Sequence, residues 1–212
     1  SLSSASGVSV QNAIISGCGD IDTGSIQIYG SPDYSVSSSI FVDNTQAIKS
    51  RVSSNGLIEN VLFQTNSYYD INNNDQSEGL TVTKCSFNSS ICSIWNTYHS
   101  TANITFCNFN GDNGVVNDNG RYSMVHVNNC NFTCSAYAVK TRVYYYGDTE
   151  EVHINATGNY WGTINITEIN ELIWDRSDEN PSISNYNALL GVIDYIPFLT
   201  HHVIAAGVQD KK

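Results

Sequence analysis

The sequence predicts an all-β, single-domain parallel β-helix, a solenoid of about seven coils, each about 22–24 residues long, with a short helix and a tail at its C-terminal end. Two observations carry this prediction. The composition is rich in Asn, Ser, Gly, Tyr and β-branched residues, and only 14% of residues are charged, which disfavours a helical bundle. In addition, one short apolar phrase recurs at a nearly constant spacing through most of the chain.

The recurring phrase consists of two apolar residues separated by one position, one or two polar residues, a small residue, any residue and an aromatic residue. Four copies end at Phe63, Phe87, Phe109 and Phe132, so the spacing between them is nearly constant. Phe41 precedes the first of them by a similar interval, and a degenerate copy ends at Tyr160. The period predicts that each copy is one coil of a repeating structure.

Three columns of like residues stay in register through these copies: an apolar column, a small-residue column that includes Cys85, Cys107 and Cys130, and the phenylalanine column. A unit of this length with short strands cannot bury its own apolar face, so it must stack on its neighbours at about 4.8 Å. We therefore expect a core ladder of Phe41, Phe63, Phe87, Phe109 and Phe132. An antiparallel sandwich would also give short strands, but it gives no reason for fixed columns.

The segments between the copies are rich in Asn, Gly and Asp, as in 70–75 (DINNND) and 110–114 (NGDNG). We expect them to be bends, where Asn tolerates a left-handed backbone and hydrogen-bonds the coils above and below. Residues 1–162 are accordingly assigned to the coils. No cap precedes them in the sequence, so another segment or another molecule is expected to cover the N-terminal edge.

Residues 163–199 are expected to form a C-terminal cap of a helix and a closing strand. Asn165 followed by Glu168 has the layout of a capping box, and an apolar stripe predicts a helix over 166–175. Residues 200–212 form a tail whose apolar part, 203–206, could add as a strand to a neighbouring subunit. The alternative interpretation of the tail is a frayed terminus.

The C-terminal phrases 158–163 (GNYWGT) and 191–199 (GVIDYIPFL) add a family resemblance. Together with the coils, they make the chain resemble the right-handed parallel β-helix proteins of the pectin-lyase-like superfamily, in particular extracellular β-helix repeat proteins. The resemblance covers nearly the whole chain. It implies a right-handed coil and an extracellular or cell-surface location, but no single activity, because one fold hosts many functions.

Six cysteines are candidates for disulfides, which an extracellular location would favour: Cys18, Cys85, Cys92, Cys107, Cys130 and Cys134. Three of them share one inward column, where neighbouring coils would bring their α-carbons near bonding range. The alternative is a ladder of buried free thiols that act as small hydrophobic side chains. The spacing contains no C-x-x-C pair, which disfavours zinc.

Five sequons make N-glycosylation a prediction, at Asn88, Asn103, Asn131, Asn155 and Asn165. Five is also about the number that this Asn-, Ser- and Thr-rich composition gives by chance, so the count shows only that glycosylation is chemically allowed. Asn88 and Asn131 lie beside the phenylalanine column, in predicted bends or outward positions.

No catalytic site or cofactor is predicted. The patterns of pectate lyases and polygalacturonases are absent. Lys49 with Arg51, and Lys140 with Arg142, each share a strand face but are interpreted as solvated residues that guard an edge. His126 and His153 are expected to point outward on consecutive coils without enough ligands for a metal. Segment 70–74 fails the calcium-loop pattern. The pairs and triplets of tyrosine, 68–69 and 144–146, suit sugar stacking, a protein interface or simply a strand.

The predicted function is a non-enzymatic extracellular structural protein, a rigid subunit of a surface filament, sheath or adhesin. It is expected to be N-glycosylated and to associate with copies of itself or with neighbouring modules of the same chain. A net charge of −11 without a basic run disfavours nucleic acid, and no apolar stretch is long enough to span a membrane. The alternative is a carbohydrate-binding or carbohydrate-active β-helix protein. An ice-binding solenoid is disfavoured, because Thr81, Thr83 and Thr105 form no regular outward column.

Overall fold

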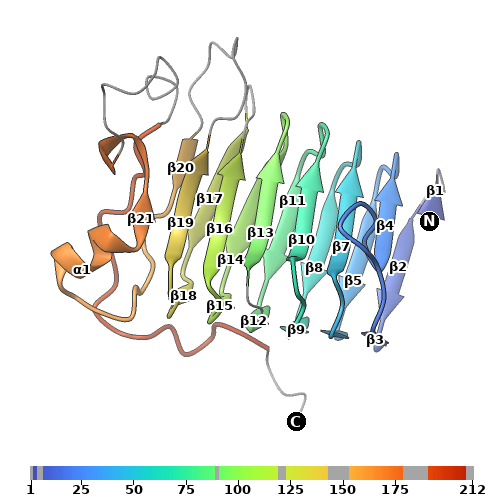
Figure 1. The fold of residues 1–212 in the computed structure, drawn as a ribbon, viewed down its shortest axis with the longest axis horizontal. Coiled ribbons are helices and arrows are strands. Elements are labelled where there is room, and N and C mark those ends of the chain that lie inside the picture. The colour runs from blue at the N-terminus through green and yellow to red at the C-terminus, as the bar shows by residue number, and fades with distance from the viewer. Residues whose placement is uncertain are drawn as a thin grey trace.

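The computed structural model describes residues 2–3, 7–88, 91–118, 123–142, 153–178 and 191–208, which form a parallel β-solenoid of about six turns (Figure 1). The predicted fold class is confirmed. The turns number about six rather than about seven because the first and last are longer than the repeat: Val8 pairs with Tyr34, and Val125 pairs with Ile154. Each complete turn contributes one strand to each of three sheets, here called A, B and C.

All pairs of neighbouring strands are parallel. Sheet A comprises β1 (Leu2–Ser3), β4 (Ile26–Tyr29), β7 (Gln46–Arg51), β10 (Tyr69–Asn74), β13 (Cys92–Thr97), β16 (Asn113–Asp118), β19 (Tyr137–Arg142) and β21 (Ile173–Trp174). Sheet B comprises β2 (Val8–Gln11), β5 (Tyr34–Ser37), β8 (Gly56–Glu59), β11 (Leu80–Thr83), β14 (Thr101–Thr105), β17 (Met124–Asn128) and β20 (His153–Asn155). Sheet C comprises β3 (Ile14–Ser16), β6 (Ile40–Val42), β9 (Leu62–Gln64), β12 (Ser86–Asn88), β15 (Asn108–Phe109) and β18 (Asn131–Phe132).

The interior contains one continuous stack of aromatic rings. The five phenylalanines of the predicted ladder are fully buried, and their successive ring centroids lie 5.4, 4.9, 4.8 and 4.8 Å apart. The stack continues to Trp161, 5.1 Å from Phe132, so the degenerate copy places Trp161 in the column and not Tyr160 as expected from the sequence. Tyr160 instead pairs with Asn131, whose side chain faces outward.

The corners between sheets depend on left-handed backbone conformations. Seven residues with positive φ form one column between sheets B and C: Asn12, Ser38, Asn60, Lys84, Phe106, Asn129 and Gly158. Between sheets A and B, the same conformation falls on Val52, a β-branched residue that disfavours it. Asn and Gly suit these corners as predicted, but the stacking of turns imposes the same conformation on residues that lack this preference.

Buried asparagines form a second internal ladder. Asn73, Asn96 and Asn117 are fully buried, and each of the first two donates its side-chain Nδ2 to Oδ1 of the next, at 2.7 and 2.9 Å. This ladder makes the expectation of a bend over 70–75 wrong, because Asp70–Asn74 belong to strand β10 and only Asp75 and Gln76 turn. The low strand propensity of Asn is overcome because neighbouring turns accept hydrogen bonds from its amide Nδ2.

Helix α1 (Ile166–Glu171) begins at Asn165, as the capping layout predicts, but it is shorter than expected. Asn165 Oδ1 accepts a hydrogen bond from the backbone N–H of Thr167 at 3.0 Å, and Asn165 Nδ2 donates to Glu168 Oε1 at 3.0 Å. Strand β21 then returns to sheet A, followed by a 3₁₀ turn, η1 (Arg176–Asp178). Figure 1 shows α1 at the end of the solenoid opposite the N-terminus.

The C-terminal strap, residues 200–208, runs back along the outer side of sheet C, past β18, β15 and β12 (Figure 1). The tail that was expected to be frayed or to reach a neighbour therefore contacts its own chain over these residues. Residues 209–212 lie outside the described part of the chain.

Candidate functional site

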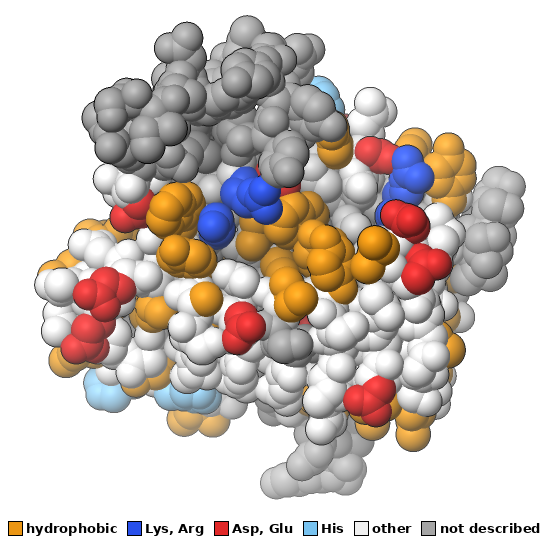
Figure 2. All heavy atoms as spheres, in the orientation of Figure 1, with side chains coloured by type: hydrophobic (Ala, Val, Ile, Leu, Met, Phe, Trp, Pro, Cys, Tyr) orange, Lys and Arg blue, Asp and Glu red, His pale blue; other side chains and the backbone are white. Residues whose placement is uncertain are grey.

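The outer face of sheet A carries the best candidate site. Inward positions at the centre of its strands are apolar, amide or hydroxyl residues, and the alternate positions point outward and align by register. One outward column comprises Lys49, Asn72, Trp95, Val116, Lys140 and Trp174. The next comprises Arg51, Asn74, Thr97, Asp118 and Arg142. Aromatic, amide and charged groups thus align on one face, where Figure 2 shows hydrophobic side chains beside Lys, Arg, Asp and Glu.

A pocket of about 390 Å³ opens on this face, within the size range of small-molecule sites. Its lining comes from strands β10, β13, β16 and β19 and from three neighbouring loops: Ile21, Asp22, Tyr68, Tyr69, Asn72, Asn74, Trp95, Thr97, Tyr98, Asp118 and Arg142. The pocket combines aromatic surface with amide, hydroxyl, carboxylate and guanidinium groups. We call it the sheet A pocket.

Aromatic rings form one wall of the sheet A pocket. The centroids of Tyr69 and Trp95 lie 5.0 Å apart, and those of Tyr68 and Tyr69 lie 4.2 Å apart. The guanidinium carbon of Arg142 lies 5.2 Å from the Trp95 ring centroid, a cation–π arrangement. These contacts fix the orientation of Trp95, which leaves part of a large apolar ring exposed in a pocket rich in polar groups.

Asp118 supplies a carboxyl group of altered acidity. It is only 5% exposed, and its Oδ1 has no hydrogen-bond partner among the described residues. Burial raises the pKa of Asp118 to about 6, although Arg142 and Lys140 act in the opposite direction. The carboxyl group therefore changes charge between about pH 5 and pH 7, within the physiological range.

Two basic pairs flank the aromatic wall. The Nζ atom of Lys140 lies 4.6 Å from the Tyr137 ring centroid and 4.8 Å from that of Trp174. On the other side, Arg51 forms an ion pair with Asp75, and Lys49 Nζ donates to the backbone oxygen of Asp22 at 2.6 Å. Figure 2 shows these two groups of Lys and Arg separated by hydrophobic side chains. The two basic pairs, which the sequence analysis interprets as solvated residues at a sheet edge, thus border the sheet A pocket.

All six cysteines are free thiols in the structure, and all except Cys18 are buried. Cys85, Cys107 and Cys130 repeat one arrangement, in which each Sγ donates to the carbonyl oxygen two residues earlier, at 3.3, 3.3 and 3.4 Å. The arrangement is that of the thiol ladder, the alternative to disulfides in the sequence analysis.

Thiol reactivity should therefore divide the cysteines into two classes. Burial raises the pKa of Cys85, Cys92 and Cys107, and that of Cys134 to about 12, so these thiols are neutral as well as inaccessible at pH 8. We expect one fast-reacting thiol, Cys18, with a thiol-specific chromogenic reagent, and five that react at least about 100-fold more slowly until the chain unfolds. Fewer than six thiols in denatured, unreduced protein would instead reveal a disulfide.

The five sequons fall in different environments. Asn103 is exposed on the outer face of β14, and Asn88 and Asn165 are also exposed. Asn155 is half-buried, and its Oδ1 accepts from the N–H of Thr157 at 3.1 Å. Asn131 is 3% exposed, and its Nδ2 donates to Asn108 Oδ1 at 2.7 Å and to Val203 O at 3.0 Å. Both Nδ2 hydrogens are used, so a glycan on Asn131 and the docked strap exclude each other.

The histidines and the calcium-like segment do not form a site. His126 and His153 lie on neighbouring strands but two positions out of register, because His153 pairs with Met124 and His126 with Asn155. Both histidines point outward on consecutive coils, as expected, but they do not lie side by side. Asp70 is buried and accepts from Asn66 Nδ2 at 2.8 Å, away from outward-facing Asn72. Within the described ranges, no three His, Cys, Asp or Glu side chains are grouped so that they could hold a metal ion.

Sequence reasoning singles out Tyr68, Tyr69 and the two basic pairs, but it does not place them in one site. It does not single out Trp95 or Asp118. A usable signal existed: Lys49, Asn72 and Trp95 are spaced by one repeat each, and Lys140 follows two turns later. Applying the repeat to outward positions would have placed these residues in one column. Tyr144–Tyr146 lie outside the described residues.

Comparisons of the chain with protein-family models, with curated proteins and with solved structures find no match. The fold alone defines the class of this protein, which is the parallel β-solenoid. In the part of the chain that the structure describes, no helix has the length and apolar character needed to cross a membrane.

Proposed function

We propose that this protein is a non-enzymatic, carbohydrate-binding β-solenoid that holds a glycan in the sheet A pocket. The observation that carries the proposal is the pocket's combination of a tilted aromatic wall, Tyr69 and Trp95, with amide, carboxylate and guanidinium groups on adjacent strands. The carbohydrate-binding alternative of the sequence analysis is preferred on this ground over a purely structural role.

Physical chemistry supports a sugar as the ligand. A pyranose ring has apolar C–H faces that pack against aromatic rings, and a rim of hydroxyl groups that need hydrogen-bond partners. Asn72, Asn74 and Thr97 line the pocket beside the aromatic wall, and Asp118 and Arg142 add charged groups. The underlying strands are hydrogen-bonded on both sides, so the pocket residues are held on rigid elements before a ligand arrives.

Binding is favoured over cleavage by the position of Asp118. A general acid in glycoside hydrolysis must reach the glycosidic oxygen within hydrogen-bond distance, and a partner carboxylate must stand across the bond. Asp118 is 5% exposed, and its Oδ1 is enclosed by protein. This carboxyl group is suited to shaping the charge of the pocket more than to protonating a bound substrate.

The structural role expected from the sequence is retained as a second candidate, favoured by the uninterrupted ring stack from Phe41 to Trp161. Such a rod would serve as a rigid spacer in a surface filament, sheath or adhesin. For this role we also propose membership of the right-handed, pectin-lyase-like β-helix proteins and an extracellular location, on the ground of the coils and C-terminal phrases quoted above. Glycosylation is proposed from the five sequons, and self-association from the N-terminal edge, for which the sequence shows no cap. Fibres in electron micrographs of native material would support this second role.

Trp95→Ala tests the proposed site. A panel of neutral and acidic polysaccharides is first screened for binding, and the affinity of the best ligand is measured by titration calorimetry. Removing a central aromatic anchor costs about 2 kcal/mol or more, so we expect the affinity to fall about 30-fold or more. Met124→Ala, a large exposed residue on the outer face of sheet B, is the matched control and should leave affinity unchanged.

The same experiment separates the alternatives. Retention of full affinity by Trp95→Ala, or no binding to any polysaccharide, would contradict the proposed site. Release of reducing or unsaturated sugar ends during the screen would instead establish the enzyme alternative.

A further inference from the structure

The C-terminal strap is bound mainly through its backbone by outward side chains of sheet C. Asn131 makes two hydrogen bonds with the backbone of Val203. Its Oδ1 accepts from Val203 N–H at 2.7 Å, and its Nδ2 donates to Val203 O at 3.0 Å. An asparagine side chain here mimics a peptide group of a neighbouring strand. Asn108 Nδ2 then donates to Ala206 O at 3.1 Å.

The distal part of the strap follows the same rule. The N–H of Gly207 donates to the backbone oxygen of Phe106 at 2.8 Å, and the N–H of Val208 donates to Ser86 Oγ at 3.0 Å. The side chain of Ile204 contributes little, since it is 94% exposed. Backbone recognition makes the site tolerant of most residues at the exposed strap positions.

Gly207 is the exception to this tolerance. Its φ is +86°, which L-residues rarely adopt, and a Cβ atom there would lie 2.2 Å from Asn108 Nδ2 and 2.8 Å from Ser86 Oγ. The preceding residue, Ala206, is 7% exposed and is packed against the site. The segment turns at 204–205, where the N–H of Ala206 donates to Val203 O at 3.1 Å. The site therefore selects a segment that turns and then carries a small residue followed by glycine.

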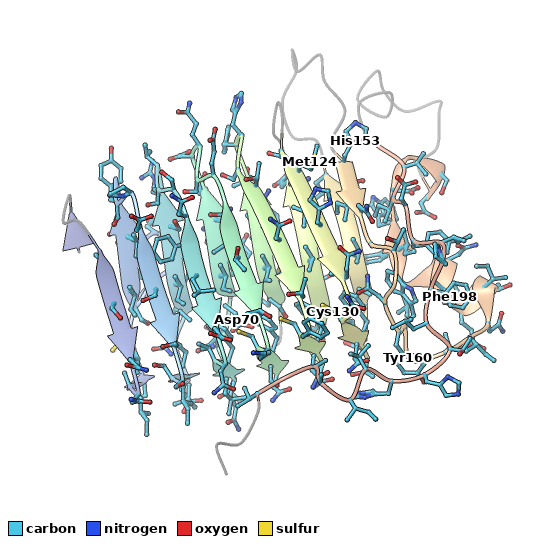
Figure 3. The ribbon with its side chains drawn as sticks, turned by 180° about the vertical axis from the view of Figure 1, so that it is seen from behind. Asp70, Met124, Cys130, His153, Tyr160 and Phe198 are labelled. Atoms are coloured by element: carbon cyan, nitrogen blue, oxygen red, sulfur yellow. The ribbon has the colours of Figure 1, made fainter. Side chains whose placement is uncertain are left out.

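We propose that Ser86, Asn108 and Asn131 on the outer face of sheet C form a peptide-binding site, whose ligand is a segment that makes a β-turn and then presents a small residue followed by glycine. Its resident occupant is the chain's own strap, and the strap of a second copy fits the same contacts. Figure 3 shows the strap passing Tyr160 toward the earlier turns, and the His202 ring meets Tyr160 edge-on with centroids 5.9 Å apart. This inference is independent of the carbohydrate-binding proposal, because the two sites lie on different sheets.

Docking within one chain has a strong advantage over docking between chains. Leu199 is anchored, because its N–H donates to Asn159 O at 2.8 Å, so the strap is tethered only a few residues from its site. Tethering gives an effective concentration in the millimolar range or above. A peptide added in solution should therefore bind only when the resident strap is displaced.

The test uses the full chain with Gly207→Ala, which leaves every site residue intact. We expect hydrogen exchange at the amides of Val203 and Val208, which donate to Asn131 and Ser86, to become at least about tenfold faster than in the wild type, while the amides of β12, β15 and β18 stay protected. Ile204→Ala, at an exposed strap position, is the matched control and should leave exchange unchanged. Continued protection of the strap in Gly207→Ala would overturn the steric argument.

Peptide binding is then measured by fluorescence anisotropy with a labelled synthetic peptide of residues 200–208. We expect it to bind the Gly207→Ala chain but not the wild type, and a peptide carrying Gly207→Ala to bind at least about tenfold more weakly. Adding Asn131→Asp to the Gly207→Ala chain should abolish binding, because a carboxylate oxygen would face Val203 O. No binding to the Gly207→Ala chain, or equal binding of both peptides, would overturn the proposal.

Discussion

Replacing Phe87 by alanine should lower the free energy of unfolding by about 3–5 kcal/mol. Phe87 is fully buried in the middle of the ring stack, 4.9 Å from Phe63 and 4.8 Å from Phe109, with interplanar angles of 1° and 2°. Alanine would leave a cavity that the turns above and below cannot fill, because their strands are fixed by parallel pairing on both sides. Urea unfolding followed by circular dichroism measures the change.

Two further variants give this prediction its controls. Phe87→Leu keeps much of the volume and should cost clearly less than the alanine variant. Leu57→Ala removes a large side chain that is 37% exposed on the outer face of sheet B, and should cost less than about 1 kcal/mol. A loss below about 1 kcal/mol for Phe87→Ala would mean that the ring stack is not the main source of core stability.

Asp118→Asn is expected to stabilise the protein at neutral pH. Because burial raises the pKa of Asp118 to about 6, the folded state holds a proton that the unfolded state has already lost between about pH 4 and pH 6. The contribution of this group to the free energy of unfolding is therefore fully present below about pH 4. It is lost as the pH rises from about 4 to about 6. The corresponding free energy is at most about 3 kcal/mol.

The measurement is a series of urea titrations from pH 4 to pH 8. We expect Asp118→Asn to raise the free energy of unfolding by about 1–3 kcal/mol at pH 8, with part of the gain offset because Arg142 loses a nearby carboxylate. At pH 4 the difference should be small, since the wild-type group is then neutral. Asp33→Asn, an exposed variant with the same change of charge, is the control for the change in net charge. Equal effects of both variants would contradict the assigned acidity.

The fold could be predicted from the sequence because one period governs several residue types together. Phe63, Phe87 and Phe109 share a column only if turns stack in parallel, and no local preference produces that agreement. The capping residue Asn165 was likewise readable from its immediate neighbours. Strand β10 could not be predicted from its local sequence, because Asn72, Asn73 and Asn74 prefer bends in isolation. They become strand residues only between paired turns.

The candidate site was harder to predict because it depends on how outward positions align. Trp95 and Arg142 lie two turns apart along the chain, and their contact follows from two successive registers, β13 with β16 and β16 with β19. The altered acidity of Asp118 also depends on burial, which no local pattern reports. Trp161 was misplaced by one residue because the last turn is longer than the others, so the period alone could not locate it.

The C-terminal strap also has a mechanical consequence. Hydrogen bonds between successive turns run along the length of the rod, so a pulling force applied between its two ends would be carried by one interface after another in series. The strap is hydrogen-bonded to Asn131, then to Asn108 and then to Ser86, so it links three successive turns. Under tension, the turns that precede β12 should separate first, and the three turns linked by the strap should separate last.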